Sequence, residues 1–142
     1  MTRSTSVRFV DTNVLYAVSR EPDERAKAQR ANEILDAKDV ALSVQVLQEF
    51  YVQATRYSRP NRLSHDDAAN LVESFLRFPV TQLTTAVVLA AIATRERFQI
   101  SYWDAAILEA SRSIGCDLVL SEDLSDGEDY GGVRVENPFR DC

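Results

Sequence analysis

The apolar runs of this chain are short, and long segments with helical periodicity separate them. The runs that fit β-strands are residues 7–10, 40–43, 80–83, 117–120 and a weaker run at 133–135. Strands separated by one or more helices are typical of α/β folds, in which crossover helices join parallel strands. We therefore predict a three-layer α/β/α sandwich with a short, mostly parallel sheet. A length of 142 residues fits a single domain spanning residues 1–142.

Start and stop signals define the expected helices. The helical patterns cover residues 22–36, 44–57, a segment that begins after Ser64, 85–98, and 101–114. Pro22 opens the first pattern, and Ser64 and Ser101 are good N-cap residues. Pro60 and Gly115 are expected to end helices, because proline breaks the hydrogen-bond ladder and glycine adopts the left-handed cap.

Charge and hydropathy exclude several classes of protein. The formal net charge is -6, which argues against a protein that binds polyanions over its whole surface. The longest apolar run, residues 86–93, is too short to cross a bilayer, and no secretory signal is visible. Cys116 and Cys142 form no spaced motif. We expect both to be reduced thiols and the protein to be cytoplasmic, with no membrane partner.

Two aspartates follow predicted strands. Asp11 comes directly after the strand VRFV, and Asp123 lies three residues beyond DLVL. The carboxyl ends of parallel strands gather ligand sites, so both would reach the same edge of the sheet. The alternatives are helix capping for Asp11 and a polar turn for Asp123.

Two further acids lie on predicted helices. Asp104 fits a capping box with Ser101, yet it also lies on the same helix face as Ile107 and Leu108. A carboxylate on the core side of a helix is costly unless it is paired or bound to a cation. Glu49 lies at the edge of an apolar face, where a solvated glutamate is the common alternative.

The four acids gain meaning in combination. If Asp11, Glu49, Asp104 and Asp123 converge, their mutual repulsion raises their pKa values, and a divalent cation relieves it. Oxygen ligands without clustered histidine or cysteine favour Mg²⁺ or Mn²⁺ over zinc.

Four segments in order resemble the PIN-domain nucleases, and more narrowly the VapC-like toxins of type II toxin–antitoxin pairs. The segments are FVDTNVLYA (9–17), SVQVLQEFY (43–51), SYWDAAILEAS (101–111) and LVLSEDLSDG (118–127), followed by VRVENPF (133–139). The resemblance covers about residues 7–139.

The resemblance implies a Mg²⁺- or Mn²⁺-dependent endoribonuclease that cleaves single-stranded RNA. It places the catalytic, metal-binding acids at Asp11, Glu49, Asp104 and Asp123. It also implies a homodimer and a cognate VapB-like antitoxin that blocks the pocket.

Less specific assignments complete the expected site. Supporting polar positions around the acids are expected at Asn13, Ser121 and, with a less defined role, Asp126. Side chains that could follow the RNA path are Arg20, Lys27, Arg56, Arg59, Tyr102 and Trp103. Aromatic rings can stack on bases, although helix-boundary aromatics also serve in cores and interfaces.

Two other readings use the same acids. One is a phosphotransfer or phosphatase domain with Asp11 as the nucleophile. It is disfavoured because Asn13 stands where one such pattern requires aspartate, and no lysine follows Lys38. The other is a metal-binding interaction module without catalysis.

Overall fold

The computed structural model of the chain describes residues 7–20 and 24–142, and these form five strands and six helices. The strands are β1 (Arg8–Val10), β2 (Val40–Ser43), β3 (Val80–Thr81), β4 (Leu118–Leu120) and β5 (Arg134–Glu136). The helices are α1 (Thr12–Val18), α2 (Arg25–Asp36), α3 (Val44–Thr55), α4 (His65–Phe75), α5 (Thr85–Phe98) and α6 (Tyr102–Ser113).

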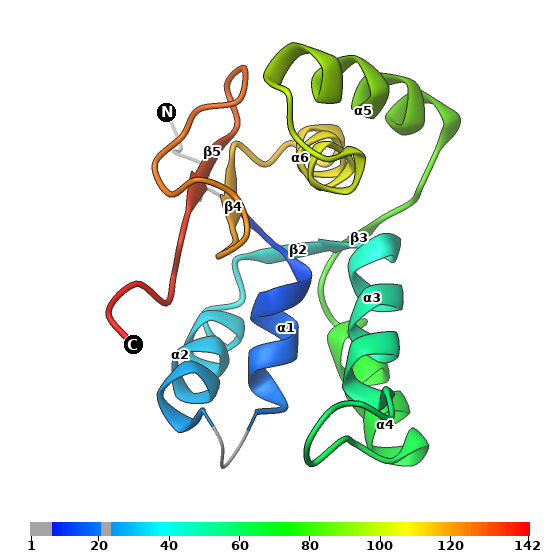
Figure 1. The fold of residues 1–142 in the computed structure, drawn as a ribbon, viewed down its shortest axis with the longest axis vertical. Helices are drawn as coiled ribbons and strands as arrows, with labels where there is room; N and C mark the ends of the chain where they lie inside the picture. The colour runs from blue at the N-terminus through cyan, green and yellow to red at the C-terminus, as the bar shows by residue number, and fades with distance from the viewer. Residues whose placement is uncertain (1–6, 21–23) are drawn as a thin grey trace.

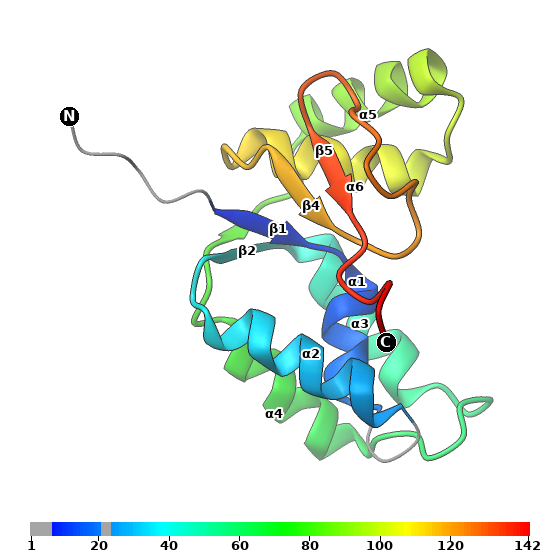
Figure 2. The ribbon, with the colours of Figure 1, turned by 90° about the vertical axis from the view of Figure 1, so that its left-hand side faces the viewer.

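The five strands form one sheet in the order β3-β2-β1-β4-β5, and every pairing between them is parallel. Helices α1 to α4 lie on one side of the sheet, and α5 and α6 lie on the other (Figures 1 and 2). The predicted three-layer α/β fold with a short parallel sheet is confirmed. Because all strands run the same way, the segments that follow β1 and β4 leave the sheet at the same edge.

The centre of the sheet is apolar, as expected for strands covered on both faces. Phe9 and Val10 of β1 are fully buried, and all four residues of β2 are buried. Phe50 of α3 and Phe75 of α4 meet edge to face, with ring centroids 5.2 Å apart. The core thus holds β1 and the first turns of α1 and α3 in fixed positions.

Serine or threonine side chains cap four of the helices. Ser43, Ser64, Thr84 and Ser101 each accept a hydrogen bond from the amide three residues later. Each such cap typically contributes about 1 kcal/mol to helix stability. The predicted caps Ser64 and Ser101 are therefore confirmed.

Most predicted helix bounds agree with the structure, and two differ. The 85–98 helix is observed with the predicted bounds, whereas α3 ends at Thr55 instead of Tyr57. It stops early because the carbonyl of Ala54 accepts from the Leu63 amide and the Arg59 guanidinium, which turns the chain back. The predicted start at Pro22 lies outside the described residues, and α2 begins at Arg25.

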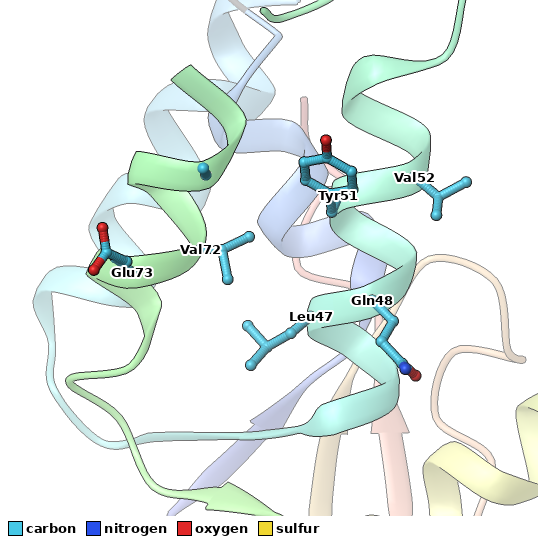
Figure 3. A pocket seen from close by; sticks show the side chains of 7 residues that line it. Leu47, Gln48, Tyr51, Val52, Val72 and Glu73 are labelled. Atoms are coloured by element: carbon cyan, nitrogen blue, oxygen red, sulfur yellow. The ribbon is translucent and has the colours of Figure 1, made fainter. Parts of the chain in front are cut away.

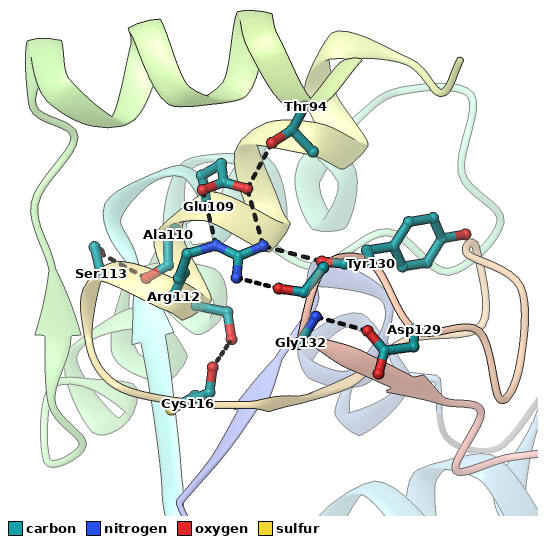
Figure 4. A network of polar contacts seen from close by, with 11 residues as sticks. Thr94, Glu109, Ala110, Arg112, Ser113, Cys116, Asp129, Tyr130 and Gly132 are labelled. Carbon is teal, nitrogen blue, oxygen red and sulfur yellow. Dashed lines mark hydrogen bonds and ion pairs between the residues drawn. The ribbon is translucent and has the colours of Figure 1, made fainter. Parts of the chain in front are cut away.

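An ion pair within α6, between Glu109 and Arg112, also contacts the connection between β4 and β5 (Figure 4). The buried Glu109 carboxylate accepts from the Thr94 hydroxyl at 2.8 Å and from Arg112 Nε at 3.1 Å. Arg112 also donates to the carbonyls of Tyr130 and Gly131 at 2.9 and 2.7 Å. This network fixes the segment after β4 against α5 and α6.

None of the helices in the described ranges has the length and apolar character needed to cross a membrane.

Candidate active site

An acidic cavity of about 430 Å³ opens where β1 and β4 end. The side chains that line it come from α1, α3, α6 and the loop after β4: Asp11, Thr12, Asn13, Tyr16, Gln45, Glu49, Gln53, Trp103, Asp104, Ile107, Glu122 and Asp123. All four acids singled out in the sequence therefore line the same cavity. They come from four separate segments of the chain, which the parallel sheet brings to one edge.

Asp11 is the most deeply placed of these acids. It is 4% exposed and acts as the N-cap of α1, with Oδ1 accepting from the Thr12 amide at 2.7 Å. Burial raises the pKa of this carboxyl from its ordinary 3.8 to about 7, and the charges of Asp123 and Glu49 act in the same direction. Hydrogen bonds from Ser121 and Thr12 oppose the rise. Asp11 thus caps α1 and is also a carboxyl group whose ionised form is disfavoured by its surroundings.

The hydroxyl of Ser121 connects several polar residues of the site. Ser121 is fully buried just after β4, and its Oγ donates to Asp11 Oδ2 at 2.7 Å. The same oxygen accepts from Asn13 Nδ2 at 3.3 Å and from the Asp123 amide at 3.1 Å. Asn13 in turn accepts from the Glu122 amide at 3.3 Å. Asn13 and Ser121 therefore join the end of β1 to the loop that carries Asp123.

Thr12 connects two of the acids. Its amide donates to Asp11, and its hydroxyl donates to Glu49 Oε1 at 2.6 Å. Thr12 is 5% exposed, so this hydroxyl faces little competition from water. The first turn of α1 consequently orients a carboxylate from β1 and another from α3.

Asp104 lies at the start of α6. Its amide donates to the N-cap Ser101 Oγ at 3.0 Å, which confirms that Ser101 caps the helix. Burial raises the pKa of the Asp104 carboxyl, the Ser101 hydrogen bond lowers it, and the charges of Asp123 and Glu49 raise it. Asp11 and Asp104 therefore both experience the charges of Asp123 and Glu49.

The chemistry of this donor set fits a hard divalent cation. Carboxylate and amide oxygens line the cavity without any histidine or cysteine, which matches the ligand preference of Mg²⁺ and Mn²⁺. Burial and, to a smaller extent, the charges of Asp123 and Glu49 raise the pKa values of Asp11 and Asp104, and a bound cation would favour the ionised form of both carboxyl groups. Within residues 7–20 and 24–142, no three His, Cys, Asp or Glu side chains form a ready-made group around one ion position. The fit thus rests on charge and donor type.

The residues expected along an RNA path are placed differently from one another. Trp103 lines the cavity and is 64% exposed, and its ring meets Tyr102 edge to face at 5.1 Å. Tyr102 itself packs on the small buried cluster around Ala91. Lys27 forms a 3.0 Å ion pair with Glu122 at the cavity.

The expected arginines are not among the side chains that line the cavity. Arg20 donates to the hydroxyl of Tyr16, a cavity residue, at 3.1 Å. Arg56 is exposed at the far end of α3. Arg59 is 7% exposed, and its guanidinium donates to the carbonyls of Ala54 and Ser19 and stacks over Tyr16. Arg59 therefore stabilises the fold by connecting these carbonyls, and we no longer expect it to contact RNA.

Asp126 does not join the acidic cavity. Its carboxylate accepts from the Asn137 amide at 2.8 Å and pairs with Arg140 at 3.0 Å. The Asn137 amide and the Arg140 guanidinium lower the pKa of the Asp126 carboxyl. The sequence interpretation of Asp126 as a support for the four acids is corrected accordingly: it anchors the C-terminal segment.

Several cavity residues were missed in the sequence. Gln45 and Gln53 lie four residues before and after Glu49, so helical spacing on α3 could have revealed them. Glu122 and Thr12 were not singled out as site residues either, although Thr12 lies between Asp11 and Asn13.

A second hollow, about 630 Å³, lies between α3 and α4 (Figure 3). Leu47, Tyr51 and Val72 point into the space between the two helices. Glu73 is the only charged residue among those that line it. Although this hollow is the larger one, it lacks the groups that acid–base or metal chemistry requires, so we place the candidate site at the acidic cavity.

Comparisons with known proteins agree on a fold. A model of the PIN domain family matches residues 8–125. No curated protein sequence matches the chain. Among solved structures, VapC20 of Mycobacterium tuberculosis, a sarcin–ricin loop cleaving toxin, superimposes with a TM-score of 0.65 at 22% identity, over 82% of this chain and 89% of that chain.

Two complexes resemble the chain to a similar degree. A toxin–antitoxin complex from Klebsiella pneumoniae gives a TM-score of 0.67 at 20% identity, over 94% of this chain and 98% of the other. DNA-bound VapBC from Salmonella typhimurium gives 0.65 at 20% identity, over 94% and 99%. At identities of 20–22%, the similarity to these structures shows a shared fold and nothing further.

Proposed function

The chain belongs to the PIN domain family, and we propose that it is a metal-dependent endoribonuclease that acts as the VapC-like toxin of a toxin–antitoxin pair. One observation carries the proposal: Asp11, Glu49, Asp104 and Asp123 reach one cavity from four separate segments. This arrangement lowers the stability of the fold, because burial and neighbouring charges disfavour the ionised form of Asp11 and raise its pKa to about 7. A functional role for the acids would explain why the fold keeps it.

We assign the four acids to a Mg²⁺ or Mn²⁺ ion. When bound, such an ion lowers the pKa of a water molecule and neutralises charge on a phosphodiester. The chain itself supplies orientation: Ser121 and the Thr12 amide hold both oxygens of Asp11, and the Thr12 hydroxyl holds Glu49. Fixing the acids beforehand spares the reaction the entropy of arranging them.

RNA is the substrate that suits the surroundings of the cavity. The exposed ring of Trp103 beside the acids offers a stacking surface for an unpaired base. Lys27, paired with Glu122, and Arg20, bonded to Tyr16, place positive charge near the cavity in a chain of net charge -6. A single strand can bring one phosphodiester to the acids while its neighbours contact these groups. VapC20, which shares the fold, is a toxin that cleaves the sarcin–ricin loop.

Three further properties belong to the proposal. We propose a small antitoxin partner, because solved complexes that share the fold pair a toxin with an antitoxin. A basic side chain of such a partner could neutralise the four acids. We propose a homodimer, supported by the exposed apolar side chains of Leu89 and Ile92 on α5. We propose a cytoplasmic location, where the unpaired Cys116 and Cys142 would stay reduced.

The alternative of aspartate-based phosphotransfer gains no support from the cavity. That chemistry pairs the nucleophile with a lysine, and the side chains that line the acidic cavity include no lysine.

The proposal is tested by incubating purified protein with end-labelled single-stranded RNA in Mg²⁺, in Mn²⁺ and in EDTA. We expect cleavage that requires the metal and that Asp11→Asn removes. Asp126→Asn is the matched control, because Asp126 lies outside the cavity and pairs with Arg140. Metal-independent cleavage, or equal cleavage by Asp11→Asn, contradicts the proposal. Phosphate covalently bound to Asp11 would instead support phosphotransfer.

A further inference from the structure

Gln45 is a buried amide in the wall of the acidic cavity. It lies on α3 one turn before Glu49, lines the cavity, and is 9% exposed. Its Nε2 is shielded from solvent and has no hydrogen-bond partner among the described residues. The first turn of α3 thus presents a donor without an acceptor beside the four acids.

An unpaired buried donor destabilises the folded state, because it has lost its hydrogen bonds to water without gaining a new partner. An apolar side chain of similar size would avoid that cost at this position. The unpaired donor can strengthen binding of a ligand that brings an acceptor into the cavity. A donor that is already fixed in place loses little entropy when it pairs.

We propose that Gln45 is a substrate-binding residue that donates from Nε2 to an oxygen of the RNA sugar–phosphate backbone at the cleaved step. The proposal rests on the proposed ribonuclease function. Gln45 offers a neutral, unpaired donor in a cavity wall that also carries five carboxylates. Those carboxylates repel a phosphate oxygen, whereas the amide attracts it.

The depth of Gln45 selects the part of the RNA that it can meet. Gln45 as a residue is 9% exposed and lines the cavity, so only groups that enter the cavity can reach its side chain, whereas Trp103, at 64%, is open to neighbouring nucleotides. The acceptor is therefore expected at the cleaved step and is either a non-bridging phosphate oxygen or the adjacent 2′-hydroxyl. Both are hydrogen-bond acceptors on the same backbone.

The test compares Gln45→Met with wild type in thermal stability and in kinetics. Methionine keeps the length of the side chain and removes the donor. In EDTA we expect an unchanged or higher Tm, because an unpaired buried donor is removed. With Mg²⁺ and RNA we expect kcat/KM to fall about 10-fold or more. Gln45→Glu, which keeps the shape and loses the donor, should fall at least as far.

Gln48→Met is the matched control on the same helix. Gln48 is exposed and lines the apolar hollow instead of the acidic cavity, so its kcat/KM should equal that of wild type. If Gln45→Met lowers the Tm by several degrees, Gln45 is a structural residue and the proposal is wrong.

Modified substrates identify the acceptor. If it is the 2′-hydroxyl, a 2′-deoxy nucleotide at the cleaved step slows wild type about 10-fold and slows Gln45→Met no further. If it is a phosphate oxygen, a single phosphorothioate diastereomer shows that pattern instead. Modifications that slow both proteins equally would overturn the proposal and leave the nuclease function standing. A wild type that cleaves no RNA at all would remove both.

Discussion

The Oγ atom of Ser121 lies 2.7 Å from Oδ2 of Asp11, although 110 positions separate the two residues in the chain. This hydrogen bond connects the segments that follow the neighbouring strands β4 and β1. Its direction matters for chemistry, because a donated hydrogen bond stabilises the ionised form of a carboxyl group that burial disfavours.

Ser121→Ala is expected to shift the pH dependence of cleavage. Loss of the hydroxyl removes a contact that lowers the pKa of Asp11, so that pKa rises above about 7. A rise of about one unit would cut the ionised fraction at pH 7 roughly fivefold. In a pH profile of kcat/KM, the acid limb should move to higher pH and activity should recover near pH 9. Ser125→Ala, in the same loop but exposed, should leave the profile in place.

Asp11 should make the metal-free protein less stable as pH rises. Its folded pKa of about 7 exceeds its unfolded 3.8, so the folded state binds more protons between these values. The unfolding free energy then falls as pH rises from about 4 to about 7, by about 4 kcal/mol in total. In EDTA, Asp11→Asn should gain Tm over wild type between pH 5 and pH 8. A constant difference across this range would argue that the carboxyl is not buried in its charged form.

Divalent cations should stabilise the wild type through the four acids. Ligand present at 100 times its Kd contributes about 2.7 kcal/mol, which a Tm shift reports directly. We expect Mg²⁺ or Mn²⁺ to raise the Tm of wild type and of Asp126→Asn alike, and to have little effect on Asp104→Asn. An equal rise in Asp104→Asn would place the ion elsewhere.

The Glu109–Arg112 pair should matter for stability and not for chemistry. Arg112→Met leaves the buried Glu109 carboxylate without its cation, and it also removes the contacts to the carbonyls of Tyr130 and Gly131. We expect a loss of about 2 kcal/mol in chemical denaturation, less than for a fully buried pair because Arg112 is partly exposed. Adding Glu109→Gln to this variant should recover part of the loss. Cleavage per folded molecule should not change.

Aspartate substitutions that introduce charge on α5 should dissociate the proposed homodimer. Leu89 and Ile92 lie three residues apart and are 68% and 53% exposed. Light scattering of the Leu89→Asp, Ile92→Asp variant should give a mass near 16 kDa where wild type gives twice that value. The Tm extrapolated to low protein concentration should match that of wild type, because these side chains are not in the core. A monomeric wild type would remove the homodimer from the proposal.

The sequence predicted the fold well wherever local signals decide. The apolar run of residues 86–93 predicted the 85–98 helix, the cap residues Ser64 and Ser101 predicted the starts of two others, and short apolar runs predicted the strands. The end of α3 was missed because it depends on Arg59 and Leu63 folding back onto Ala54, a contact between separate segments.

The site was predictable in part. The positions of Asp11 and Asp123 after strands, and of Asp104 on an apolar face, followed from pattern. The role of Ser121 as a shared hydrogen-bond partner depends on the pairing of β1 with β4, which spacing alone does not reveal. Helical spacing places Gln45 one turn before Glu49, but it was missed because a neutral amide gives no charge signal that would have singled it out.

The spread of the four acids along the chain also bears on biosynthesis. Asp11 leaves the ribosome early, whereas Ser121 and Asp123 are added only after more than a hundred further residues. A growing polypeptide therefore cannot assemble the cavity until the segment that carries Ser121 and Asp123 has been made. The proposed nuclease would consequently lack a complete acidic site while the residues before Asp123 are still being synthesised.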